Sequence, residues 1–180
     1  MIKWLLRRGA RTFGKTYDYD VSYMLDVINT STGSGARLSA FPLISQYRGP
    51  KAAAPIWMGA IFASTLEGDC GPCAQLVVDM ARAAGADTLD LKRCFDGDPE
   101  QAGDIGLGFR FAMAAIHGHL DVDDLQAEIE TRYGRQAVVA ASFAAATGRF
   151  YPVFKRGLGY GHACHQLVFD GKQELALAPS

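Results

Sequence analysis

The chain has 180 residues, of which 49% are hydrophobic and 21% charged, and its formal net charge is −1. A chain of this length buries roughly two-thirds of the surface that its unfolded form exposes, so we expect one domain that needs no disulfide staples. Because lysine and arginine do not outnumber aspartate and glutamate, the composition argues against a general nucleic-acid-binding protein. No apolar run approaches the ~20 residues of a transmembrane helix, and we expect no membrane-spanning segment.

The first 16 residues combine positive charges with apolar side chains and contain no acidic residue. The Arg7–Arg8 pair is not followed by a hydrophobic segment of export-signal length, so neither a secretory nor a twin-arginine signal is predicted. We expect a helix whose Trp4 and Leu5 face packs on the body of the protein or on a neighbouring subunit; a basic helix at an anionic membrane is the alternative. The reducing cytoplasm is the expected location.

Apolar residues recur at three- and four-residue spacing along most of the chain, which predicts helices. The expected helices span residues 17–28, 36–47, 51–66, 73–84, 88–95, 98–117, 121–133 and 135–147, with a polar loop at 29–35 and a loop-rich tail after 148. Residues 166–169 are expected as a lone strand or an extended tail. Because neither strand alternation nor a βαβ pattern recurs, we predict an all-α protein, and the thioredoxin fold is disfavoured. Helices that are apolar on more than one side favour a homo-oligomer.

Two local signals refine these helices. Asp121 is expected to cap a helix that Gly134 ends. The glycines Gly103, Gly106 and Gly108 weaken the start of the preceding helix, and close approach of another backbone explains them better than helix propensity does.

Residues 67–73, with the sequence EGDCGPC, join two thiols to the start of a helix. Asp69 is expected to cap this helix. A thiol in the first helical turn lies near the positive end of the helix dipole and near free backbone amides, which favour the thiolate. Cys70 is therefore a candidate nucleophile, and Cys73, one turn further on the apolar side, lies within disulfide reach.

A CxxC pair also occurs in metal sites and in ordinary cores. The cluster formed by His162, Cys164 and His165 is the one that could complete a metal site, but its histidines are one residue closer in sequence than in common zinc fingers. We predict a redox pair, with neither a metal nor an organic cofactor. Cys94 is expected to be a buried structural thiol.

Three features carry a resemblance to a known family: a helix that ends in residues 63–65 (AST), the segment 67–73, and an apolar helix through Met80 and Gly85. This pattern resembles the alkylhydroperoxidase D-type branch of the carboxymuconolactone decarboxylase-like group. The resemblance covers residues 50–165 and implies an oligomeric, AhpD-like all-helical bundle of about seven to nine helices. It also implies a CxxC pair that reduces hydroperoxides or exchanges disulfides. Residues 1–49 would then be N-terminal helices that pack on the body or a neighbouring subunit, and residues 166–180 a tail.

The chain departs from this family at its proton relay. Val77 stands where the family has a histidine, four residues after the second cysteine, and Met58 stands where it has a glutamate, twelve residues before the first. The resemblance implies that Cys73 attacks and Cys70 resolves, whereas helix position favours Cys70 as nucleophile, so the order stays open. Glu67 either replaces the missing proton acceptor or only complements the helix N-terminus.

The sequence therefore predicts a thiol–disulfide oxidoreductase of alkylhydroperoxidase type, with Cys70, Cys73 and Glu67 as catalytic residues. Its substrate would be a small hydroperoxide or a disulfide, and its reductant a dithiol. The alternative is a helical binding or assembly module that has lost the proton relay.

Overall fold

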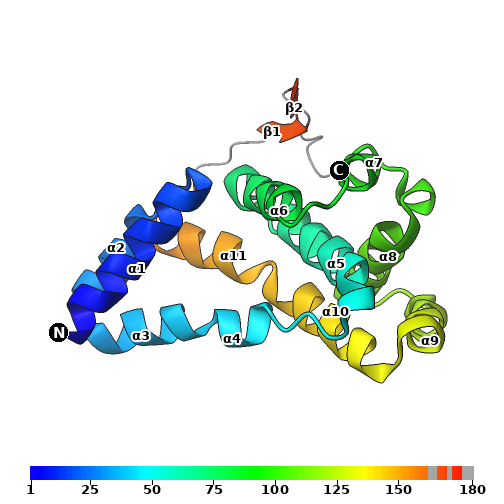
Figure 1. Cartoon of the computed structure of the whole chain (residues 1–180), viewed down its shortest axis with the longest axis horizontal. Coiled ribbons are helices and arrows are strands. Elements are labelled where there is room, and N and C mark those ends of the chain that lie inside the picture. The colour runs from blue at the N-terminus through cyan, green and yellow to red at the C-terminus, as the bar shows by residue number, and fades with distance from the viewer. Residues whose placement is uncertain (162–165, 170–171, 176–180) are drawn as a thin grey trace.

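The computed structural model describes residues 1–161, 166–169 and 172–175, and helices make up most of them, which confirms the all-α prediction (Figure 1). The elements are α1 (Ile2–Tyr17), α2 (Ser22–Thr30), α3 (Thr32–Ala40), α4 (Pro42–Ser45), the 3₁₀ helix η1 (Lys51–Ala53), α5 (Ala54–Glu67), α6 (Gly71–Ala83), α7 (Leu89–Phe95), the 3₁₀ helix η2 (Pro99–Gln101), α8 (Gly103–His117), α9 (Val122–Tyr133), α10 (Arg135–Thr147), α11 (Phe150–Gly157), β1 (Gln166–Phe169) and β2 (Lys172–Leu175).

Helix α5 is the centre of the core. Every residue from Ile56 to Thr65 is buried, as expected for a helix that is apolar on all sides. Its two buried hydroxyl groups find partners inside the core: Ser64 Oγ donates a hydrogen bond to the carbonyl oxygen of Ala145 in α10 at 2.6 Å, and Thr65 Oγ1 donates to that of Ile61 at 2.7 Å. Helices α8, α10 and α6 pack around it.

Helices α5 and α8 touch backbone to backbone through glycines. A methyl group added at Gly59 would overlap the carbonyl oxygen of Ile105, and one added at Gly108 would overlap that of Ile56. Because no side chain separates the two backbones at these points, the helices approach more closely than larger residues would allow. The close approach expected at Gly108 is therefore confirmed.

The other two glycines at the start of α8 have different roles. A side chain on Gly106 would overlap the carbonyl oxygen of Pro99 in η2, which confirms the expected close approach there. Gly103 has no such neighbour and instead adopts a φ of +53°, which favours glycine. The single helix expected over 98–117 is thus two elements, η2 and α8.

The N-terminal region differs from the prediction. Residues 29–35 do not form a loop, because Ser31 caps α3 by accepting hydrogen bonds from the amides of Gly33 and Ser34. The helix expected over 36–47 divides at Phe41, since α3 ends at Ala40 and α4 starts at Pro42. Helix α1 has no fully buried residue and packs on α2 and α3.

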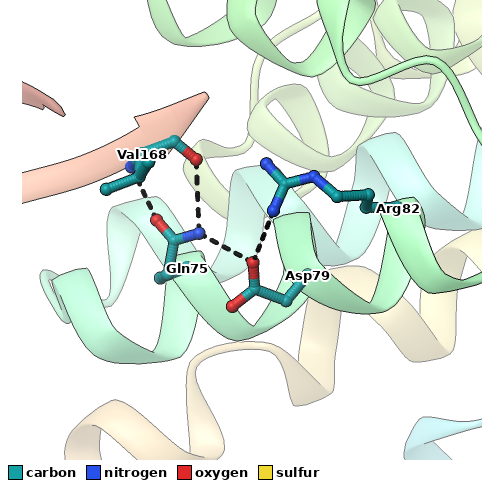
Figure 2. A network of polar contacts seen from close by, with 4 residues as sticks. All are labelled: Gln75, Asp79, Arg82 and Val168. Atoms are coloured by element: carbon teal, nitrogen blue, oxygen red, sulfur yellow. Dashed lines mark hydrogen bonds and ion pairs between the residues drawn. The ribbon is translucent and has the colours of Figure 1, made fainter. Parts of the chain in front are cut away.

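Residues 166–169 form strand β1 of a two-stranded sheet, so the expectation of a lone strand or an extended tail was wrong. Strand β1 pairs antiparallel with β2 and lies against α6. Figure 2 shows the Gln75 side chain bound to both backbone groups of Val168: its Oε1 accepts from the amide at 2.7 Å, and its Nε2 donates to the carbonyl oxygen at 3.3 Å. Leu167 and Phe169 are consequently buried in the same core as α5.

Residues 135–157 are the one described stretch that is long and apolar enough to cross a membrane, and half of its apolar window is buried inside the protein. The stretch is divided, since α10 ends at Thr147 and α11 begins at Phe150. The core helix of a folded protein accounts for this pattern.

Replacing Gly108 with alanine should destabilise the protein, because the added methyl group must push α5 and α8 apart. We expect the free energy of unfolding to fall by about 1–3 kcal/mol or more in urea denaturation. Gly9→Ala is the matched control, since Gly9 has open space around it in α1 and alanine favours helix. Equal losses in the two variants would contradict the close α5–α8 contact.

Candidate functional site

The CxxC pair lies at the N-terminus of α6, and this helix begins two residues earlier than the sequence suggested. Cys70 is the N-cap residue, and the helix starts at Gly71 with Pro72 in its first turn. The structure makes Cys70 the N-cap residue in place of Asp69, which precedes it with a φ of +53°, and the Cys70 side chain itself makes no capping hydrogen bond. The Cys70 sulfur is thereby placed beside the free amides of the first turn.

The two sulfur atoms lie 2.6 Å apart and are joined by a hydrogen bond between free thiols. Cys70 is partly exposed and borders a small hollow of about 30 Å³, which Lys155 and Arg156 also line. Cys73 is buried, with 6% of its surface exposed, and borders a separate hollow of about 70 Å³. Solvent therefore reaches Cys70 more readily than Cys73.

The two thiols have different pKa values because their surroundings differ. The hydrogen bond with Cys73 and the positive charges of Lys155 and Arg156 lower the pKa of Cys70 to about 6, against the opposing effect of burial. The hydrogen bond to Cys70, burial and the negative charge of the Cys70 thiolate raise the pKa of Cys73 above its usual range. The lowered pKa of Cys70 and the raised pKa of Cys73 favour a thiolate on Cys70 beside a protonated Cys73.

Two residues from distant parts of the chain complete the site. Tyr19 Oη lies 3.5 Å from Cys73 Sγ, and Lys155 Nζ donates to Tyr19 Oη at 3.4 Å. Burial and the neighbouring Tyr23 and Cys73 raise the pKa of Tyr19 far above its usual range, so its hydroxyl stays protonated. A row of polar groups therefore runs from the Lys155 amine through the Tyr19 hydroxyl to the thiol pair.

Lys155 is buried to an unusual degree for a lysine, with 6% of its surface exposed. Its Nζ lies over the rings of Tyr19 and Tyr23, at 5.2 and 5.4 Å from their centroids. It forms no ion pair with a carboxylate of the described residues. The aromatic faces and the Tyr19 hydroxyl stabilise the cation, and its positive charge helps to lower the pKa of Cys70.

Sequence analysis missed Tyr19 and Lys155, which lie 136 positions apart. One signal was available for Lys155: it follows Tyr151 by four residues and Pro152 by three, and so falls on the face of α11 that packs inward. No spacing connects either residue to the CxxC segment, since only the packing of the N-terminal region and α11 against α6 brings them there.

Glu67 does not contact the thiol pair in this structure. Its carboxylate forms an ion pair with Arg149, with 3.0 Å between Oε2 and Nε. Glu67 thus stabilises the junction of α5 with α11 in this arrangement.

Val77 and Met58, which stand where the resemblance would place the relay histidine and glutamate, line the same small apolar hollow. Neither side chain can carry a proton.

The candidate metal cluster at His162, Cys164 and His165 lies outside the described residues. Within the described ranges, no group of three or more histidine, cysteine, aspartate or glutamate side chains is arranged to hold a metal ion. Cys94 is buried at 3% exposure, and its pKa is raised to about 12 by burial and by Asp90, as expected for a structural thiol.

Searches of protein-family models, of curated proteins and of solved structures found no match to this chain. Membership of the alkylhydroperoxidase D-type family stays a prediction from the sequence.

The acidity of Cys70 can be measured from the pH dependence of its alkylation by iodoacetamide, with the modified residue identified by peptide mass spectrometry. We expect half-maximal rate near pH 6 in the parent. In Cys73→Ala the midpoint should move toward the ordinary thiol value of about 8.5, because the hydrogen-bond donor is gone. Cys94 should stay unmodified and serves as the internal control. A parent midpoint near pH 8.5 would contradict the proposed thiolate.

Proposed function

We propose that this protein is a thiol–disulfide oxidoreductase of alkylhydroperoxidase type, in which Cys70 attacks the substrate and Cys73 resolves the intermediate. The observation that carries the proposal is the hydrogen-bonded sulfur pair, with a partly exposed thiol of lowered pKa beside a buried thiol of raised pKa. The resemblance of residues 50–165 to the alkylhydroperoxidase D-type family supports the same class. The proposal includes a homo-oligomer in the reducing cytoplasm and a dithiol as reductant.

With a hydroperoxide, the Cys70 thiolate attacks the terminal oxygen. An S–O bond forms, the O–O bond breaks, and the alkoxide leaves as an alcohol after taking a proton from solvent, which leaves a sulfenic acid on Cys70. The Cys73 sulfur then attacks the Cys70 sulfur, and its proton leaves with the hydroxide as water. An external dithiol reduces the resulting disulfide through a mixed disulfide and is itself oxidised.

With a disulfide substrate the same two residues suffice. The Cys70 thiolate attacks one substrate sulfur, forming a mixed disulfide and expelling the other sulfur as a thiolate. Cys73 then attacks Cys70, loses its proton, and releases the second half of the substrate as a thiol.

Tyr19 and Lys155 take the place of the proton relay that Val77 and Met58 cannot provide. When Cys73 loses its proton, the Tyr19 hydroxyl donates a hydrogen bond to the sulfur and the Lys155 charge stabilises the anion. Both effects lower the barrier to the resolving step, and Lys155 also favours the Cys70 thiolate that starts the reaction.

The roles of the two cysteines are separable by trapping the intermediate. After one addition of hydroperoxide, Cys73→Ser should hold a sulfenic acid on Cys70 that reacts with dimedone, because the resolving thiol is missing. Cys70→Ser should consume no hydroperoxide with a dithiol reductant. A dimedone adduct on Cys73 of the Cys70→Ser variant would reverse the order of attack, and the absence of adducts in both variants would remove the peroxidase function.

The Lys155 charge and the Tyr19 hydroxyl have distinct effects on the two steps. Lys155→Met should raise the pKa of Cys70 by about one unit, a change of about 1.4 kcal/mol, and slow sulfenic acid formation at pH 6. Tyr19→Phe should leave that step nearly unchanged and slow disulfide formation. Stopped-flow measurement of the two phases distinguishes the variants.

Lys155→Arg, which keeps the charge, and Lys15→Met, which removes an exposed lysine from α1, are the matched controls. If Lys155→Met and Lys15→Met behave alike, Lys155 has no part in the chemistry.

A second candidate function is that of a helical binding or assembly module, which the apolar residues at the two relay positions favour. Equal activity of Cys70→Ser and the parent in a cellular complementation assay would support it and exclude the redox function.

A further inference from the structure

A cavity of about 640 Å³ lies between the N-terminal helices and the body of the protein. Most of its lining residues belong to α1, α2, α3 and α4, and α6 and α11 contribute one residue each. Its volume lies within the range of about 300–1,000 Å³ that is typical of pockets for organic ligands. All four N-terminal helices lie outside residues 50–165, which carry the resemblance described above.

The inside of this cavity is apolar. Its wall includes Leu6 and Phe13 of α1, Met24 of α2, Leu38 of α3 and Met80 of α6. Exposing these side chains to water costs free energy unless a ligand covers them. The interior therefore suits a hydrocarbon chain.

The cavity opens to solvent between α1 and the α3–α4 segment. Its exposed lining residues are Leu5 and Gly9 on α1, Ser39 on α3, Pro42 on α4, and Gln46 at the end of α4. A ligand whose chain fills the interior would leave its head group at this mouth.

The helices that flank the mouth carry only positive charges. Residues 2–17 and 32–45 contain no aspartate or glutamate, although the whole chain has 19 acidic residues and a net charge of −1. The cations of these helices are Lys3, Arg7, Arg8, Arg11, Lys15 and Arg37. The Nε of Arg7 is in addition buried without a hydrogen-bond partner among the described residues. The helices on both sides of the mouth therefore carry a net positive charge, which favours an anionic head group there.

We propose that this cavity binds an anionic single-chain amphiphile of the fatty-acid class, with the hydrocarbon chain inside and the carboxylate at the cationic mouth. This binding function goes beyond the redox reaction and does not depend on it. The two sites are neighbours, since Tyr151 lines both this cavity and the small hollow beside Cys73. A bound chain would thus end next to the thiol pair.

The test is calorimetric titration of the full chain with laurate and with dodecylamine, both below their critical micelle concentrations. We expect saturable binding of one laurate per chain with a negative heat-capacity change, and binding of dodecylamine weaker by about tenfold or more, because the two ligands differ in the sign of the head group. Absence of saturable laurate binding, or tighter binding of dodecylamine, would overturn the proposal.

Variants at the mouth test the location. Gly9→Phe and Ser39→Phe place a large side chain on opposite rims, and each should weaken laurate binding by about tenfold or more. Gly157→Phe is the matched control, since Gly9 and Gly157 both have free space around them and only Gly9 borders the cavity. Circular dichroism checks that each variant folds.

Laurate affinity that is unchanged in both rim variants would contradict the assigned site. If these variants instead change the oligomeric state and leave laurate binding as in the parent, a second copy of the chain fills the cavity and the proposal fails. Hydroperoxide turnover of the parent is measured separately, so loss of one function is distinguishable from loss of the other.

Discussion

The structure depends on the close contact between α5 and α8. Helix α5 is buried on all sides, and Gly59 and Gly108 allow its backbone to touch that of α8 without intervening side chains. Helix α5 ends at Glu67, and only three residues separate it from α6. The short connection holds the N-terminus of α6, and with it Cys70, in a defined position against the core.

The chemistry of the thiol pair follows from unequal environments only one helical turn apart. Burial alone would raise the pKa of both cysteines, and it does so for Cys73. At Cys70 the hydrogen bond from Cys73 and the charges on α11 outweigh burial, so the thiolate is the stable form at neutral pH. One thiol is therefore ready to attack while the other keeps its proton until it is needed.

The sequence was sufficient to predict most of the helices, because their apolar periodicity is a local property, but it did not show the start of α3, the break at Phe41, the division of η2 from α8, or α11. The CxxC segment at a helix start and the burial of Cys94 were likewise visible in the spacing of residues. The roles of Tyr19 and Lys155 were not, since residues 136 positions apart meet only through tertiary packing. Asp69 is not the N-cap residue for a local reason: it adopts a left-handed conformation, and the N-cap position falls on Cys70. The sequence also could not show that Glu67 forms an ion pair with Arg149, because this contact depends on α10 and α11 folding back onto α5.

The structure brings together two features that lie apart in the sequence: the thiol pair of Cys70 and Cys73, and an apolar cavity lined mostly by the N-terminal helices. Tyr151 borders both the cavity and the hollow beside Cys73, so the proposed ligand would lie in the same region of the molecule as the sulfur atoms.

The central claim is that Cys70 and Cys73 exchange between dithiol and disulfide in one turnover. The most direct measurement is peptide mapping by mass spectrometry of the reduced parent protein after one equivalent of hydroperoxide. A peptide that links Cys70 to Cys73, formed with loss of two hydrogen atoms, is the predicted result. Consumption of the hydroperoxide without this linkage, or two intact thiols after exposure, would contradict the account.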